Sequence, residues 1–175
     1  HARSAESCAK AVRHGIDILY HMTYIDDATM DLLEQRKDSV FVAPGLHWLI
    51  ATCEEADVFG YERSRAELVG YVEELEVSIA GMKEMHRRGI KVLPGGDYGF
   101  AWTPHGTNAR DLQHFVERLG FTPMEAIRSA TVYGGEIMQD AKLGNVLPGF
   151  YADLLLVDGD PLTDIAILQD KSKLV

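Results

Sequence analysis

The chain has 175 residues, of which 46% are hydrophobic and 25% are charged, as is ordinary for a globular domain. Its formal net charge of −10 argues against nucleic acid or an anionic membrane as a partner, because both require a basic surface. No apolar run approaches the length of a membrane span, and two cysteines are too few for a disulfide framework. We therefore expect a protein of a reducing compartment, the cytoplasm.

The first half of the chain alternates between helical and strand-like patterns. Its predicted elements are a helix at 2–14, a strand at 16–20, a helix from Asp26 or Asp27 to about 37, a strand at 40–43, a long loop at 46–64, a helix at 65–88 that could be two joined at Gly81, and a strand at 90–93. This order is the alternation of parallel βα units, and it predicts an α/β fold.

The second half of the chain begins with a glycine- and aromatic-containing loop at 98–108. Two helices are predicted after it, at 109–119 and 122–138. The second has a clear start signal, with Thr122 as N-cap, Pro123 at the first helical position and Glu125 at the third. The tail then changes period, and residues 152–158 predict a strand.

The stretch from Lys91 to Gly99 is the most informative one for function. Its apolar run predicts a strand buried on both faces, and Gly95-Gly96 lets the backbone turn sharply before Asp97. Chemistry in α/β barrels gathers at the C-terminal ends of the strands, so Asp97 is well placed for an active site. A carboxylate that only caps the following turn explains this stretch equally well.

Two histidines stand at comparable positions earlier in the chain. His1 and His21 lie 20 residues apart, which leaves room for a helix and a strand between them. If His1 closes a strand of its own, both imidazoles lie at the same end of neighbouring strands. Together with Asp97 they are the residue types that bind zinc and similar divalent ions. A hydrogen-bonded core histidine remains an open alternative for His21, and a frayed terminus for His1.

The remaining histidines and aromatic residues divide into two groups. For His105 a substrate-contacting role and a plain loop histidine are equally open. Candidates for lining a pocket are His47, Trp48, Phe59 and Tyr98, although surface exposure is the stronger alternative for Phe59. The histidines that stand in helical patterns with charged neighbours are predicted to be solvated or capping, namely His14, His86 and His114.

Several segments together resemble the second half of an enzyme of the amidohydrolase superfamily, nearest to its imidazolonepropionase and Xaa-Pro dipeptidase branch. They are His1-Ala2-Arg3-Ser4, Tyr20-His21-Met22-Thr23, Pro94-Gly95-Gly96-Asp97, Pro104-His105-Gly106 and the tail at 143–162. The tail is the most specific of them, because its Gly-x-Val-x-Pro-Gly-x-x-Ala-Asp pattern is similar to the family segment that returns to a small β-sandwich.

The resemblance implies a fold and a set of metal ligands. Residues 1–140 would form about strands five to eight of a (β/α)8 barrel, and residues 141–175 a segment of the β-sandwich. His1 would be the ligand after the fifth strand, His21 the ligand after the sixth, and Asp97 the ligand after the eighth. The implied cofactor is one or two divalent ions, with zinc as the first expectation.

The resemblance also implies a reaction, the hydrolysis of an amide-type bond in a small molecule or dipeptide. A metal-activated water would attack, Asp97 would act as general base, and His105 would help to polarise the carbonyl. The chain departs from the family pattern around two of these residues, with Tyr20-His21-Met22 in place of Glu-His-Gly and Gly96-Asp97 in place of Thr-Asp. Substrate preference therefore does not carry over.

No His-x-His occurs in the chain and no bridging lysine can be assigned. The chain begins at His1, and we expect a missing N-terminal half of the barrel, in the same or a separate chain. Because exposed strand edges favour association, we also expect a homo-oligomer. An alternative is a catalytically inactive barrel subunit that supports a complete hydrolase. A flavodoxin-like domain is disfavoured, since no glycine-rich phosphate loop follows a first strand.

Overall fold

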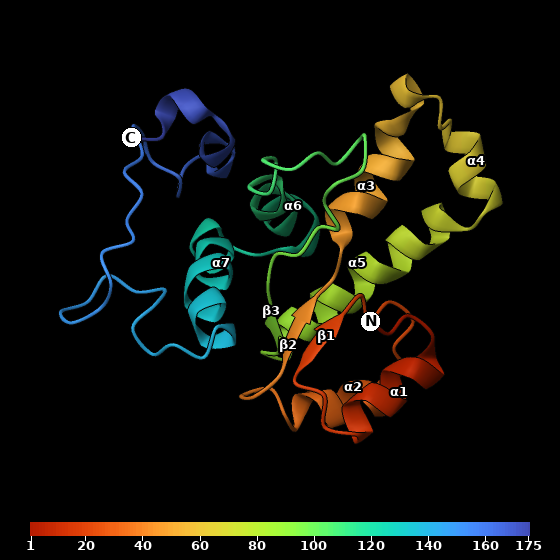
Figure 1. The fold of residues 1–175 in the computed structure, drawn as a ribbon. Helices are drawn as coiled ribbons and strands as arrows, with labels where there is room; N and C mark the ends of the chain where they lie inside the picture. Colours follow the sequence, from red (N-terminus) through yellow and green to blue (C-terminus); the bar gives the residue numbers. More distant parts are fainter.

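The computed structural model describes all residues from 1 to 175 (Figure 1). Its regular elements are α1 (Ala5–Arg13), β1 (Ile18–Tyr20), α2 (Asp27–Glu34), β2 (Phe41–Ala43), α3 (Leu46–Glu54), η1 (Ala56–Phe59), α4 (Arg63–Leu68), α5 (Tyr71–Arg87), β3 (Lys91–Val92), α6 (Arg110–Leu119), α7 (Pro123–Ile137), η2 (Ile165–Gln169) and η3 (Lys171–Lys173). The expected α/β alternation is confirmed.

The three strands form a parallel sheet in the order β1-β2-β3, so each strand lies beside the one before it in the chain. Ala2 extends this order on the far side of β1 through a parallel bridge to His21. All crossovers between the strands contain helices, as parallel pairing requires. The carboxyl ends of the strands therefore meet at one edge of the sheet.

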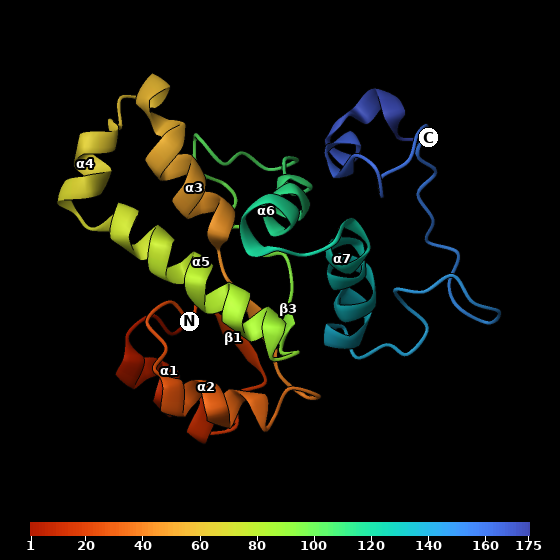
Figure 2. The ribbon, with the colours of Figure 1, turned by 180° about the vertical axis from the view of Figure 1, so that it is seen from behind.

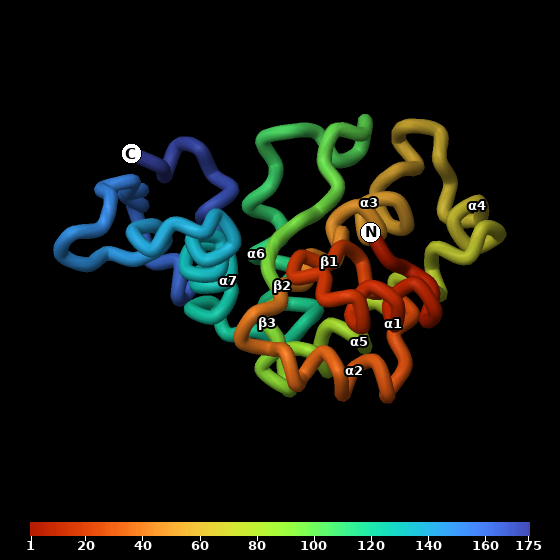
Figure 3. The backbone as a smooth tube through the Cα atoms, turned by 60° about the horizontal axis from the view of Figure 1, so that its bottom comes forward, coloured from red at the N-terminus to blue at the C-terminus, as the bar shows by residue number.

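The main hydrophobic core lies on one face of this sheet. Leu19, Val42 and Val92 enter it from the three strands, and most of the other members come from α1, α2, α3, α5 and α6. Figure 3 shows α1, α2 and α5 running together along one side of the strands. A smaller cluster on the other face joins Phe41 and Leu93 to α7. None of the helices is long and apolar enough to cross a membrane.

The prediction of a long loop at 46–64 is wrong. This stretch forms α3 and η1 and ends in the first turn of α4. Leu46, Leu49, Ile50 and Cys53 are buried at helical spacing, a pattern that the aromatic and polar residues between them obscured. The predicted helix at 65–88 is divided at Gly70, where the backbone is left-handed, rather than at Gly81.

The strand predicted at 152–158 does not form in this chain. Only Val157 makes a bridge, to Leu174, while Leu154, Leu155 and Leu156 are exposed. A strand needs a hydrogen-bonded neighbour, and the apolar pattern cannot reveal whether one is present. In Figures 1 and 2 the tail runs along the far side of α7, away from the sheet.

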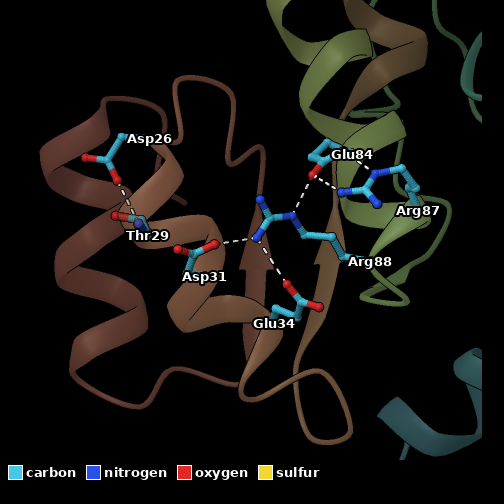
Figure 4. Close-up of polar contacts among 7 residues, drawn as sticks. All are labelled: Asp26, Thr29, Asp31, Glu34, Glu84, Arg87 and Arg88. Carbon is cyan, nitrogen blue, oxygen red and sulfur yellow. Dashed lines mark hydrogen bonds and ion pairs between the residues drawn. The ribbon is translucent and has the colours of Figure 1, made fainter.

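Three carboxylates surround Arg88 and tie α2 to α5 (Figure 4). The Arg88 guanidinium donates to Asp31 at 2.5 Å and to Glu34 at 3.1 Å on α2, and to Glu84 at 2.6 Å on α5. Its side chain is only 17% exposed. Arg87 also pairs with Glu84, but its side chain is 70% exposed and it reaches no second element.

Arg88→Met is expected to lower the urea midpoint of unfolding, because it removes the cation shared by three carboxylates and leaves them to repel one another. The loss should shrink in 1 M salt, which screens that repulsion. Arg87→Met is the matched control and should change the midpoint little, since exposed ion pairs contribute little. Equal effects of the two substitutions would contradict this account.

Candidate active site

The carboxyl ends of the three strands place His21, Gly45 and Asp97 next to one another. His21 directly follows β1, and its backbone N–H donates to the Ala43 carbonyl at the end of β2, at 2.9 Å. Asp97 follows β3 after the Gly95-Gly96 turn. Parallel pairing alone accounts for this meeting of residues that lie far apart in sequence.

The structure brings together the three residues expected to bind a metal. His1 Nδ1 lies 2.9 Å from His21 Nε2, and His21 Nδ1 lies 3.9 Å from the Asp97 carboxylate. The His1 ring also stacks on Tyr20, with 5.0 Å between ring centroids. His21 therefore stands in the middle and uses both ring nitrogens, one toward each neighbour.

The backbone is strained at this cluster. His21, Met22 and Asp97 have positive φ angles of 72°, 52° and 54°, and only one other non-glycine residue of the chain, Gln139, shares this feature. Left-handed backbone is unfavourable for residues with a Cβ and persists only where the surroundings enforce it. Three of the four such residues thus lie at or next to this cluster.

Gly45 shows how closely the cluster is packed. Its φ is +69°, and a Cβ built on it would lie 3.1 Å from both Asp97 Oδ2 and His21 Nδ1. Gly95 is similarly constrained, since its Cβ would lie 2.8 Å from that of Ala43. Glycine at these positions lets the ends of the strands approach one another without displacing the two side chains.

A pocket of about 210 Å³ opens beside His21 and Asp97. Its remaining wall is formed by Arg3, Gly45, Trp48, Leu49, Glu74 and Phe100. Arg3 forms an ion pair with Glu74, a nearly buried residue of α5. Trp48 was expected to line a pocket. Arg3 and Glu74 were not expected to line it. For Arg3 the sequence offers one signal, its position two residues after His1.

The donor types at this cluster fit a divalent ion, because imidazole and carboxylate are ordinary zinc ligands. Burial lowers the pKa of His21 and outweighs the opposing charge of Asp97, which favours the neutral imidazole, the form that binds metal. The three side chains form a row, however, and no group of three or more such donors converges on one point. Holding an ion would need a rotated Asp97 carboxylate or a further donor.

The structure separates His105 from this cluster. Its imidazole lies against Gly99, where a Cβ would be 3.2 Å from Nε2. It lines a different pocket, of about 440 Å³, together with Arg110 of α6 and Lys171 of the tail. The expected role of His105 at the reacting carbonyl therefore stays a prediction.

Two histidines are more deeply buried than expected. His114 was predicted to be solvated, but it is 6% exposed and its Nε2 lies 3.1 Å from Nδ1 of the fully buried His47. Burial lowers the pKa of both to about 4. His47 therefore belongs to the interior, beside Tyr98, rather than to the pocket wall. The charged residues that follow His114 on α6, the exposed Glu117 and the half-buried Arg118, misled the prediction.

Two further expectations can be compared with the structure. His86, predicted to be solvated or capping, is half-buried in the last turn of α5, where it stacks on Phe121 with 3.7 Å between ring centroids and lies 3.7 Å from Glu125. His14 is exposed, as expected, and Phe59 lies at the surface at 53% exposure rather than in the pocket.

Asp111 is a buried carboxyl that the sequence did not single out. It lies in the first turn of α6 and is 1% exposed. Burial raises its pKa to about 7, an effect that the nearby Tyr98 side chain and Gly95 backbone only partly offset. A carboxyl that titrates near neutral pH therefore lies beneath the turn that carries Asp97.

The sequence profile of the amidohydrolase family matches residues 4–175, and the chain belongs to this family. Ochratoxinase from Aspergillus niger is 27% identical over 180 residues, which cover 97% of this chain and 34% of that protein. The chain thus spans about a third of the length of this curated relative. The expected family resemblance is confirmed.

Solved structures agree with this assignment. A putative prolidase from Bifidobacterium longum superposes with a TM-score of 0.84 at 26% identity, over 100% of this chain and 46% of that one. A Xaa-Pro dipeptidase with bound methionine gives a TM-score of 0.81 at 26% identity, over 100% and 43%. The chain therefore has the fold of a part of these proteins.

Gly45→Ala is expected to destabilise the chain by more than the roughly 1–2 kcal/mol that a left-handed backbone costs a residue with a Cβ. The added methyl would also separate His21 from Asp97. Gly60→Ala is the matched control, since φ there is +80° and a Cβ would meet nothing within 4 Å. Urea unfolding of both variants measures the difference, and equal losses would show that Gly45 is not crowded.

Asp111→Asn is expected to flatten the dependence of stability on pH between 5 and 8. Because folding raises the pKa of Asp111, its carboxyl stabilises the fold below its ordinary pKa, and this contribution is lost as pH rises through about 7. The loss amounts to a few kcal/mol, at about 1.4 kcal/mol for each pKa unit. Urea unfolding should therefore find the variant more stable than the wild type at pH 8. If the stabilities of the variant and the wild type change with pH in parallel, the pKa of Asp111 is not raised.

Proposed function

We propose that this chain is the catalytic part of a hydrolase that cleaves an amide-type C–N bond in a small molecule by means of a divalent metal ion. The observation that carries the proposal is the row His1–His21–Asp97 at the ends of parallel strands, held on a strained backbone. Membership of the amidohydrolase family supports it. The relatives named as prolidase and dipeptidase favour a dipeptide or an amide of similar size.

In this proposal each residue of the row has a defined role. His1, His21 and a rotated Asp97 carboxylate or a further donor would hold the ion, with zinc as the first candidate, and a bound ion would make a water acidic enough to attack at neutral pH. Asp97 takes a proton from the attacking water and later delivers it to the leaving nitrogen, as general base and then general acid. A neutral His21 has one ring nitrogen with a free lone pair, which could bind the ion, and one N–H, which could donate a hydrogen bond to a neighbour.

The pocket beside the row suits a small substrate. Trp48, Leu49 and Phe100 provide apolar surface next to His21 and Asp97, while Arg3 and Glu74 provide charge. Because the pocket is only about 210 Å³, it fits a dipeptide-sized group rather than a polypeptide. We include His105 as a substrate contact for the part of a ligand that reaches past Gly99.

The proposal extends to the architecture of the whole protein. Residues 1–140 would form about strands five to eight of a (β/α)8 barrel, and residues 141–175 would join a small β-sandwich. The short parallel sheet in sequential order supports the first assignment, and the exposed apolar Leu154, Leu155 and Leu156 support the second. The remaining barrel strands, from the same or another chain, would cover Ile18 and Tyr20 and provide further metal donors. A homo-oligomer belongs to the same proposal.

The test measures bound metal and hydrolysis together. After incubation with zinc and removal of the excess, the protein should retain at least one ion per chain. It should then hydrolyse members of a panel of Xaa-Pro dipeptides and N-acyl amino acids. Asp97→Asn should lower kcat by about 10²–10⁴-fold, the usual contribution of a general base. His21→Asn should lose metal, because it removes the central donor.

Asp57→Asn is the control, since Asp57 is exposed and lies on η1, away from the row. It should keep both metal and activity. A wild-type protein that takes up no metal and hydrolyses no member of the panel would remove the hydrolase proposal. Full activity of Asp97→Asn would remove the general-base role alone.

A further inference from the structure

Asp97 occupies an unfavourable backbone conformation with little visible support. Its φ is +54°, and it lies in the connection between β3 and α6, which has no helix or strand. Its side chain is 38% exposed, so packing around the carboxylate does not fix its direction. Something in the connection must therefore compensate for the strain at this residue.

Thr103 provides the one hydrogen bond that the Asp97 backbone makes within the chain. The Thr103 hydroxyl donates to the Asp97 carbonyl at 3.1 Å, and Thr103 is 0% exposed. The same residue accepts a backbone hydrogen bond from Gly99 at 2.8 Å and forms a bridge with Phe100. Residues 97–103 thus close on themselves around the Thr103 side chain.

This closed loop is attached to α3 at two points. The Trp102 indole donates to the Thr52 hydroxyl at 2.8 Å, and the Trp48 backbone N–H donates to the Gly96 carbonyl at 3.1 Å. The α3 helix begins directly after Gly45, the residue that contacts both His21 and Asp97. The helix therefore sets where the loop lies, and Thr103 sets how Asp97 is turned within it.

A buried hydroxyl donates to any acceptor within reach, so the presence of the bond alone does not assign a role to Thr103. Its acceptor, however, is the carbonyl of the strained residue itself, six positions earlier, and not a carbonyl three or four positions earlier as in the helical Ser129 and Thr131. Losing the bond would leave the Asp97 carbonyl without its one partner within the chain. The cost would fall on the conformation of Asp97.

We propose that Thr103 is a positioning residue, whose hydroxyl holds the Asp97 backbone in the left-handed conformation that aims the carboxylate at His21. Its catalytic consequence rests on the proposed function, whereas its structural consequence does not. The proposal predicts that the hydroxyl matters and the rest of the side chain does not.

The substitution that isolates the hydroxyl is Thr103→Val, which keeps the shape of the side chain and removes the donor. Thr103→Ser restores the donor and should restore the wild-type behaviour. Thr29→Val is the matched control, because Thr29 is 1% exposed and its hydroxyl has no partner in the chain. All three are made in the full chain.

The primary measurement is NMR of the labelled protein, through the three-bond HN–Hα coupling and the Cα and Cβ shifts of Asp97, which report its φ angle. The wild type, Thr103→Ser and Thr29→Val should show a left-handed Asp97, and Thr103→Val should not. The Thr103 hydroxyl proton should also exchange slowly with water in the wild type, a measurement that needs no variant. A freely exchanging hydroxyl would therefore refute the proposal even if Thr103→Val does not fold.

The kinetic measurement follows where the wild type hydrolyses a substrate. Thr103→Val should lower kcat by about 10- to 100-fold with KM little changed, as for a displacement of a catalytic group by about 1 Å. An Asp97 that stays left-handed in Thr103→Val, or a freely exchanging hydroxyl in the wild type, would overturn the proposal. An inactive wild type with the expected NMR result would refute the hydrolase function and leave the positioning role intact.

Discussion

Parallel pairing of three short strands is the interaction on which the rest of the structure depends. Each strand has only two or three paired residues, yet the pairing sends all carboxyl ends to one edge of the sheet. His21 and Asp97 meet there although 76 positions separate them in the sequence. The helices between the strands act mainly by burying one face of the sheet, so that its register is maintained.

The same edge concentrates unfavourable conformations. His21, Met22 and Asp97 have left-handed backbones, and Gly45 fits between two of them only because it has no Cβ. Strain of this kind costs stability and is maintained when the surrounding contacts over-determine it. Here the contacts come from α3 and from the loop closed by Thr103, so the elements around the strands have a positioning role as well as a packing role.

The interior beneath the site contains buried polar groups. His47 and His114 contact each other with pKa values lowered by burial, and Asp111 has a pKa raised by burial. Burial thus favours the neutral form of all three groups.

Hydrophobic period and turn residues are local signals, and they predicted the βα alternation and the capping box at Thr122. The resemblance of short motifs to a known family predicted the family and the three residues that form the row. The sequence did not predict α3, the burial of His114 or the absence of a strand at 152–158. Those features depend on which face of a helix meets a neighbour and on whether a strand finds a partner. Only tertiary contacts decide them, since a residue's own neighbours in sequence carry no record of what lies across from it in space.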